Sequence, residues 1–453
     1  MTVSHPVTGD LVDLARRVVA DAGPGEQVEV MVSRRTSTTV KAYDGEVESL
    51  TSADSSGAGV RVIRDGRQGF AHCGSLDAEV LRETLDEARN NATFAEPDEF
   101  NGLAVPDGVE SIPHDQWSEA VVEFAADRKI DLALDLERRV RGLDPRITGV
   151  RSTSYGDGWG EIALVSSIGI EVTDRGSSCS ISTQPLARDG DETQTGWSVD
   201  VSRDPDALDL EHVAAEAVDR ATRLLGATKP PSARMTVVLE PRLAITLLGI
   251  VSGMLSAEVV LKGRSPFVDR VGETVGSSVL TLIDDPTRQE SIGAEQYDGE
   301  GLACRANPLI IDGVLQGFLH DSYTGRRSGT ASTGSAIRGA RSLPGVGAQL
   351  LVMSPGSRSF DELVASIDHG LYVGSLTGLH SGVNRVSGDF SVGADGIMIR
   401  GGAMAEPVRE LTLGSTLQRL LLDVVEVGGD FEWLPGGDGG ASLVIADVSV
   451  SGA

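Results

Sequence analysis

The seven histidines are the residues of this chain best suited to bind a transition metal or to act as a general base. None is followed by another at the short helical spacing that brings two imidazoles onto one face. His72 is adjacent to Cys73, but neighbours on a strand point to opposite faces. The histidines therefore predict no metal site. They are His5, His72, His114, His212, His320, His369 and His380.

His320 and Cys304 are the strongest candidates for metal-free catalysis. His320 precedes Asp321, but the pair follows an expected strand at Val314–Leu319, so polar residues at a strand end are the simpler interpretation. Cys304 has no histidine nearby in the sequence, which favours a structural cysteine over a nucleophile. The chain has no G-x-S-x-G nucleophile elbow and no G-x-x-x-x-G-K-[ST] phosphate loop. Sequence motifs therefore assign no catalytic residue in this chain.

The segment Arg326–Gly334 combines two arginines with Gly, Ser and Thr, and we expect it to form a flexible loop. Because guanidinium groups bind carboxylates well, Arg326 and Arg327 could meet the carboxylate of a peptide or line a cavity. A solvated surface loop without a binding role is the alternative, and the sequence leaves both open.

The elements that would position such residues are clearest between Met235 and Leu261. Met235–Leu239 is an apolar run that predicts a buried strand, and Pro241 then opens an uncharged segment, 243–257, that predicts a helix extending to Leu261. Apolar side chains recur at helical spacing while other positions carry Gly or Ser, so we expect the helix to pack closely against a sheet. The apolar face consists of Leu243, Leu247, Ile250, Met254 and Leu255.

A series of short motifs follows in order along the second half of the chain. They are Leu247-Leu-Gly249 with Gly263, Ser265, Phe267 and Gly272; Leu282-Ile-Asp-Asp-Pro286; Asp298-Gly-Glu-Gly301 ahead of Leu309–Leu319; Ser332-Thr-Gly-Ser335; Gly382–Phe390; Pro407-Val408; Leu413-Gly414; and Val427-Gly-Gly-Asp430. In type and order they resemble the TldD/PmbA family of zinc peptidases, whose members are also described as modulators of DNA gyrase. The resemblance covers nearly the whole chain and is densest from Met235 onward.

The resemblance implies one of two branches. TldD members carry His-Glu-x-x-x-His on the helix, which supplies two zinc ligands and a carboxylate that activates water, with a further Cys near the C-terminus. The corresponding positions here are Gly249, Ile250 and Met254, and Trp433–Ala441 contains no Cys. The chain is therefore similar to the TldE (PmbA) branch, the metal-free partners of a TldD subunit. We expect no metal or other cofactor in this chain and zinc in the partner.

The resemblance also places the 326–334 segment and its surroundings near an active-site chamber. It implies that a TldE-type chain supplies wall residues and no catalytic residue. The residues expected to line the chamber are His320, Tyr323, Arg326, Arg327, Ser332, Thr333, Asn384 and Asp389.

The amino-acid composition limits the classes of partner that the protein is expected to bind and the cellular compartment in which it is expected to work. A formal net charge of −28 disfavours general binding to nucleic acid or anionic membranes, because such partners require clustered Lys and Arg. The longest uncharged apolar stretch, 243–257, is shorter than the roughly 20 residues of a membrane-spanning helix. Three cysteines without a C-x-x-C pair, and an N-terminus without a signal-like apolar region, favour a reducing compartment. We expect a soluble, cytoplasmic protein.

Two consecutive prolines in Thr228–Ser232 mark the clearest domain boundary, since they favour an extended linker. Residues 1–228 predict an α+β domain with a mainly antiparallel sheet and flanking helices, and with sub-units 1–112 and 113–228. Residues 233–453 predict a mainly-β domain with one buried helix, so the fold class is α+β. Expected strands of the first domain cover 28–32, 38–43, 46–52, 59–64, 69–72, 149–155, 161–166, 170–174, 178–186 and 196–203, and its helices cover 11–22, 76–91, 117–142 and 208–225.

The leading functional hypothesis is a TldE-like, non-catalytic subunit of a TldD/TldE-type metalloprotease complex that cleaves or matures peptides. It requires a TldD-like zinc subunit and peptide substrates as partners. One alternative is a stand-alone, metal-independent hydrolase acting on a small metabolite or peptide, with Cys304 or His320 as its agent. Another is a homodimeric module that binds peptides without cleaving them.

Overall fold

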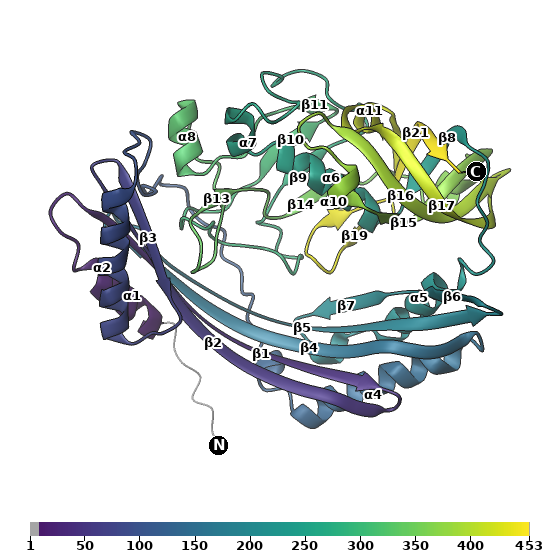
Figure 1. Ribbon diagram of the computed structural model, residues 1–453, viewed down its shortest axis with the longest axis horizontal. Coiled ribbons are helices and arrows are strands. Elements are labelled where there is room, and N and C mark those ends of the chain that lie inside the picture. The colour runs from purple at the N-terminus through teal and green to yellow at the C-terminus, as the bar shows by residue number, and fades with distance from the viewer. Residues whose placement is uncertain (1–8, 453) are drawn as a thin grey trace.

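A curved antiparallel sheet of seven strands dominates the first half of the chain in the computed structural model, which describes residues 9–452 (Figure 1). His5 lies outside the described residues. The strand order is β3-β2-β1-β4-β5-β6, with β7 paired to β5, so both expected sub-units of this half contribute to one sheet. The strands are β1 (Gln27–Tyr43), β2 (Glu46–Arg64), β3 (Arg67–Cys73), β4 (Ile147–Ser166), β5 (Glu171–Asp189), β6 (Glu192–Thr195) and β7 (Ser198–Ser202).

These strands are longer than the sequence pattern predicts. β1 joins the expected strands 28–32 and 38–43, and β2, β4 and β5 each join two expected strands in the same way. The prediction of separate strands is wrong because the polar residues between the apolar runs continue the ladder. Ser33, for example, is paired with Gly57 on one side and with Ile162 on the other.

Helices cover one face of this sheet. Val28, Val30 and Val32 near the start of β1 lie in one hydrophobic cluster with apolar side chains of helices, and Val40 and Ala42 near its end lie in another. Helices α1 and α2 pack on one end of this face, and α4 and α5 pack on the other. The opposite, concave face therefore remains available for a site. The helices are α1 (Gly9–Val19), α2 (Ala78–Phe94), α3 (Glu119–Val122), α4 (Ala126–Leu143) and α5 (Leu210–Thr222), with a short 3₁₀ helix at Pro205–Ala207.

The second half of the chain contains two six-stranded sheets and a buried helix, α6 (Pro241–Met254). One sheet has the order β17-β16-β15-β8-β21-β18, and the other has the order β11-β10-β9-β14-β20-β19. Helix α6 contacts β8 of the first sheet and β14 and β20 of the second, and its apolar side chains belong to the largest hydrophobic cluster described. Together with the first half, this arrangement confirms the α+β class and the buried helix.

The remaining elements of this half range from very short strands to the long strands β16 and β17. The strands are β8 (Ala233–Leu239), β9 (Leu282–Asp284), β10 (Asn307–Ile311), β11 (Val314–Leu315), β12 (Ala336–Ile337), β13 (Gly345–Val346), β14 (Leu351–Met353), β15 (His369–Thr377), β16 (Asp389–Arg400), β17 (Ala403–Thr416), β18 (Val424–Val427), β19 (Glu432–Trp433), β20 (Gly439–Gly440) and β21 (Leu443–Ser451). The helices are α7 (Ala257–Leu261), α8 (Ser322–Ser328), α9 (Phe360–Ala365), α10 (Leu379–Gly382) and α11 (Leu417–Leu422). No helix within residues 9–452 is long and apolar enough to cross a membrane.

Two local predictions are wrong in this half. The expected helix over 243–261 breaks after Met254, and α7 begins separately at Ala257. The expected loop over 326–334 is helical up to Ser328, because Asp321 and Thr324 form a capping box that starts α8. Arg326 and Arg327 therefore lie on a helix.

Candidate functional site

A cavity of about 690 Å³ lies over the concave face of the large sheet. Its floor is formed by the central parts of β1, β4 and β5, and its roof includes the turn at residues 292–295 of the second half. Figure 1 shows the sheet passing beneath the second half of the chain in this region. The cavity is thus an open hollow lined by parts of the protein that are far apart in the sequence.

Small side chains make this floor hollow. Gly156, Gly158 and Gly160 alternate along β4 and face Gly176, Ser178 and Ser180 of β5. On the opposite face, the intervening residues of the same strands include Tyr155, Cys179 and Ile181, which are buried against the helices. A Cβ atom on Gly158 would lie 2.9 Å from the carbonyl oxygen of Thr36, so this position has no room for a side chain.

The cavity carries charges of both signs. Arg203 donates hydrogen bonds of 3.1 Å to the carbonyl oxygens of Ser291 and Ile292, which hold the roof over the sheet. Glu295 is accessible to solvent inside the cavity, yet desolvation by the surrounding protein and the nearby Asp174 raise the pKa of its carboxyl to about 7. Desolvation also raises the pKa of Asp174. The site can therefore hold polar ligands and a proton.

Helix α6 does not fit a zinc ion. Gly249 has no side chain, and the side chains of Ile250 and Met254 are packed in the hydrophobic cluster around the helix. None of the three positions offers an imidazole, a thiolate or a carboxylate, the groups that bind zinc. Within residues 9–452, no three His, Cys, Asp or Glu side chains gather as a group that could hold a metal ion.

Six of the residues expected to line a chamber lie in one cluster at α8. The hydroxyl of Tyr323 donates to Asp98 at 2.8 Å, and Arg326 donates to the carbonyl oxygens of Phe100 and Gly102 at 2.7 and 2.8 Å. Arg327 donates to the Tyr323 hydroxyl at 3.1 Å. Arg326 thus fastens α8 to the connector that follows α2, and its hydrogen bonds are used within the protein.

The other residues of this cluster bind to the backbone. The hydroxyls of Ser332 and Thr333 each donate to the carbonyl oxygen of His320 at 3.1 Å. His320 is buried, and burial lowers the pKa of its imidazole. None of the six residues lines the 690 Å³ cavity, but Tyr323 and Arg327 line a second cavity of about 340 Å³. Their role in binding a substrate stays a prediction.

Asn384 and Asp389 lie apart from this cluster, Asn384 in the turn before β16 and Asp389 at the first position of that strand. The Asn384 side chain accepts hydrogen bonds from the backbone amides of Val386 and Ser387 at 2.9 and 3.2 Å. Asp389 accepts a hydrogen bond from the Ser387 hydroxyl at 2.6 Å. These contacts stabilise the turn, and neither residue lines the two cavities.

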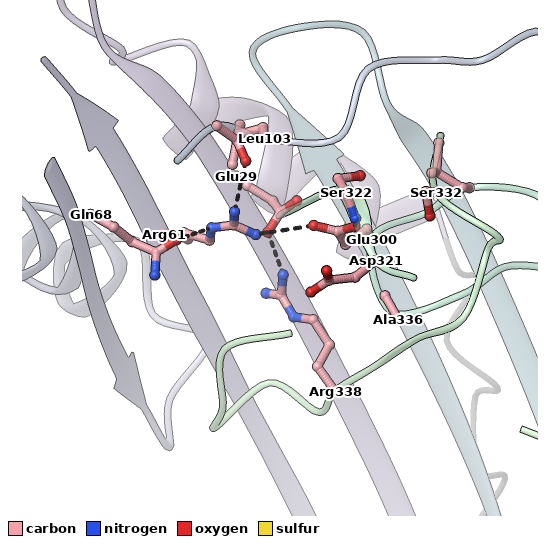
Figure 2. Close-up of polar contacts among 12 residues, drawn as sticks. Glu29, Arg61, Gln68, Leu103, Glu300, Asp321, Ser322, Ser332, Ala336 and Arg338 are labelled. Atoms are coloured by element: carbon pink, nitrogen blue, oxygen red, sulfur yellow. Dashed lines mark hydrogen bonds and ion pairs between the residues drawn. The ribbon is translucent and has the colours of Figure 1, made fainter. Parts of the chain in front are cut away.

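A buried charge cluster joins the two halves of the chain (Figure 2). Glu29 on β1 pairs with Arg338, and both side chains are fully buried. Arg61 on β2 lies 3.8 Å from Glu29 and 3.5 Å from Glu300, measured between charged atoms. Glu300 in turn accepts a hydrogen bond of 2.8 Å from the amide of Ser322, at the start of α8. The cluster thus links the large sheet to two segments of the second half.

Sequence reasoning missed both the cavity floor and this cluster. The alternation of Gly and Ser in β4 and β5 was a usable signal, since side-chain-free positions at a spacing of two hollow one face of a sheet. The charged residues gave no such signal, because Glu29, Arg61, Glu300 and Arg338 are far apart in the sequence.

Comparisons with known proteins agree with this architecture. The PmbA/TldA metallopeptidase family matches the chain in three consecutive parts: domain 1 at residues 28–92, the central domain at residues 122–225 and the C-terminal domain at residues 232–452.

Individual relatives match over most of their length. The metalloprotease PmbA of Escherichia coli O157:H7 is 26% identical over 412 residues, covering 91% of this chain and 89% of that protein. The metalloprotease TldD homologue of Haemophilus influenzae is 26% identical over 426 residues, covering 87% and 86%. The crystal structure of TldE from Thermococcus kodakarensis shares the fold with a TM-score of 0.88 and 24% identity, covering 98% of this chain and 99% of that chain. Because the matched domains span most of the sequence, this chain belongs to the PmbA/TldD family of metallopeptidases.

Proposed function

We propose that this chain is a TldE-like, non-catalytic subunit of a TldD/TldE-type metalloprotease complex, and that its curved sheet forms one wall of the peptide chamber. The observation that carries the proposal is the 690 Å³ cavity, whose floor offers small polar side chains. The non-catalytic role is supported by α6, where Gly249, Ile250 and Met254 supply no zinc ligand or base. The zinc ion and the water that it activates would belong to the TldD-type partner.

The floor suits an extended peptide without adding it as a strand. The backbone of β4 is already paired with β1 on one side and with β5 on the other. A peptide over this floor therefore contacts side chains, and the missing side chains of Gly156 and Gly160 leave space for its own. Arg35 and Arg175 line the cavity and could pair with acidic groups of the peptide.

The outer edge of β2 is the surface that best fits the partner subunit. β3 pairs with β2 only from Ala58 onward, so among the described residues no strand pairs with this edge over Glu46–Ser56. Val47 and Leu50 on this stretch are exposed apolar side chains. Unpaired backbone with apolar side chains is a template for adding a strand from another subunit.

A charge on this edge tests the partner surface. Leu50→Lys is expected to weaken association with a co-expressed TldD-type subunit, because a lysine on an exposed edge disfavours strand addition. Phe94→Lys is the matched control, since Phe94 is 80% exposed at the end of α2, away from this edge. Native mass of the co-expressed proteins is the measurement. Equal association of both variants would remove the β2 edge as the partner surface.

A bulky residue on the floor tests the chamber. Ser178→Trp places an indole in the cavity opposite Gly158 and should lower peptide cleavage by the assembled complex without releasing its zinc. Thr195→Trp on exposed β6 is the control and should leave cleavage unchanged. Full activity of Ser178→Trp would mean that substrate does not pass over this floor.

The structure gives little support to a stand-alone hydrolase. The Cys304 thiol donates to the side-chain oxygen of Gln349 at 2.9 Å, and desolvation with nearby carboxylates such as Asp298 raises its pKa. A thiol with a raised pKa is a poor nucleophile. Double replacement of Cys304 and His320 by alanine with activity retained would exclude both as catalysts.

We propose a reducing, cytoplasmic setting, in keeping with the free thiols of Cys73, Cys179 and Cys304.

A further inference from the structure

The large cavity has an acidic side, formed by Asp174 of β5 in its floor and Glu295 in its roof. Asp174 is two residues from Gly176 and four from Ser178, so the three share the face of β5 that borders the cavity. The charge of Asp174 contributes to the raised pKa of Glu295, so the two carboxylates are close enough to repel each other.

Neither carboxylate is paired with a basic group. Asp174 accepts a hydrogen bond of 2.8 Å from the backbone amide of Arg175, and the Glu295 side chain accepts none from the described residues. No ion pair within 4 Å involves either residue in the described part of the chain. His114 attracts Asp174 at longer range, but desolvation still raises the pKa of both carboxyls. Their charges are therefore not neutralised within the protein.

The arginines that line the cavity are used or placed elsewhere. Arg203 donates to backbone carbonyl oxygens of the roof. The guanidinium of Arg175 lies over the ring of Trp117, 5.0 Å from its centroid. Arg35 is on β1, which β4 separates from β5, so its backbone is two strand spacings, about 10 Å, from that of β5. The acidic side thus has no fixed cation of its own, and a ligand can supply one.

The cation that fits this side is organic. Within residues 9–452, no three His, Cys, Asp or Glu side chains form a group that could hold a metal ion. The volume of about 690 Å³ accommodates a long side chain together with part of the peptide that carries it. Gly176 leaves the approach to Asp174 open, since a Cβ atom there would meet its nearest neighbour at 3.6 Å, an ordinary contact. A guanidinium group suits best, because its five N–H donors can serve two carboxylates at once.

We propose that Asp174 and Glu295 form a subsite for a basic side chain, and that the chamber therefore prefers peptides that contain arginine. The guanidinium group lies between the floor and the roof and donates hydrogen bonds to both carboxylates. Its positive charge offsets the repulsion between them. The inference rests on the proposed function, because it requires a peptide on the floor of the cavity.

Cleavage of matched peptides by the co-expressed complex tests the inference. Short peptides of Ala, Gly and Ser carry one arginine, placed at each position in turn, and each is compared with a peptide that has uncharged citrulline at that position. We expect kcat/KM to be at least about tenfold higher for the arginine peptide at one or more positions. Equal values at every position would overturn the inference and leave the proposed function standing. A complex that cleaves neither these peptides nor unfolded casein would overturn both.

Variants locate the preference in this chain. Asp174→Asn combined with Glu295→Gln removes both charges with little change in shape and should bring the arginine-to-citrulline ratio of kcat/KM close to one. Asp191→Asn is the matched control and should keep the ratio, since Asp191 lies in the exposed turn between β5 and β6, outside the cavity.

A charge reversal provides a second test if the double variant does not fold. Glu295→Lys changes a solvent-accessible residue and should make the citrulline peptide the better substrate, because a lysine repels the guanidinium group. An unchanged ratio in Glu295→Lys and in the folded double variant would assign the preference to the partner subunit and refute this subsite.

Discussion

Replacing Arg338 by Met should destabilise the protein strongly. Arg338 and Glu29 are both fully buried, and Glu29 would retain only Arg61, 3.8 Å away, as a positive neighbour. Removing one partner of a buried pair costs about 3–5 kcal/mol, because the other charge stays desolvated. Two nitrogens of Arg338 lack hydrogen bonds among the described residues, and their removal offsets part of this cost. We therefore expect about 3 kcal/mol, more than a hundredfold in the unfolding equilibrium.

Urea unfolding followed by tryptophan fluorescence measures this change. Arg419→Met is the matched control, since Arg419 pairs with Asp423 on the exposed surface of α11 and should cost about 0–1 kcal/mol. The double variant Glu29→Gln with Arg338→Met should regain part of the loss, because it also removes the unpaired charge. The reasoning would be refuted by equal shifts in Arg338→Met and Arg419→Met, or by a double variant less stable than the single one.

Three further predictions concern the cavity and the interface between the halves. The folded protein raises the pKa of the Glu295 carboxyl to about 7, so it binds a proton more tightly than the unfolded chain does. This contribution to the free energy of unfolding is fully present below about pH 4.5 and is lost as the pH rises through about 7. Glu295→Gln should therefore melt higher than the parent at about pH 8 and at the same temperature at about pH 4, and a constant difference would contradict this assignment. Gly301→Ala should lower the melting temperature far more than Gly263→Ala: both glycines have positive φ, but only a Cβ on Gly301 meets a side chain, Ile170, at 2.5 Å. Arg326→Met should speed proteolysis within 97–113, because it removes the donor for the carbonyl oxygens of Phe100 and Gly102, and an unchanged rate would show that this contact does not hold the connector.

Local sequence patterns predicted those helices and strands that are marked by their own apolar spacing and end signals. The helix predicted over 243–261 was found as far as Met254, because apolar residues recur at helical spacing after Pro241, but its continuation to Leu261 was wrong. Helix α8 was missed because Ser322–Ser328 contains no apolar repeat, although the capping pair Asp321 and Thr324 was visible in the sequence.

The candidate site depends on contacts that no local pattern encodes. The resemblance directed attention to α8 and to Asp298–Gly301, and the structure places Glu300 of that motif in the charge cluster. The resemblance could not show that Arg61 pairs with Glu300 or that Arg338 pairs with Glu29, because those contacts join segments far apart in the chain. The cavity floor likewise requires β4 and β5 to be paired in register, so that their glycines and serines share one face.

The non-catalytic role is best tested by the metal content and native mass of the purified chain, alone and co-expressed with a His-Glu-x-x-x-His paralogue from its own genome. We expect the chain alone to be metal-free and to enter a zinc-containing complex with the paralogue. That complex should cleave peptides, and a chelator should stop the cleavage. Stoichiometric zinc in the chain alone would contradict the non-catalytic role. A metal-free homodimer that does not associate with the paralogue would contradict membership of such a complex.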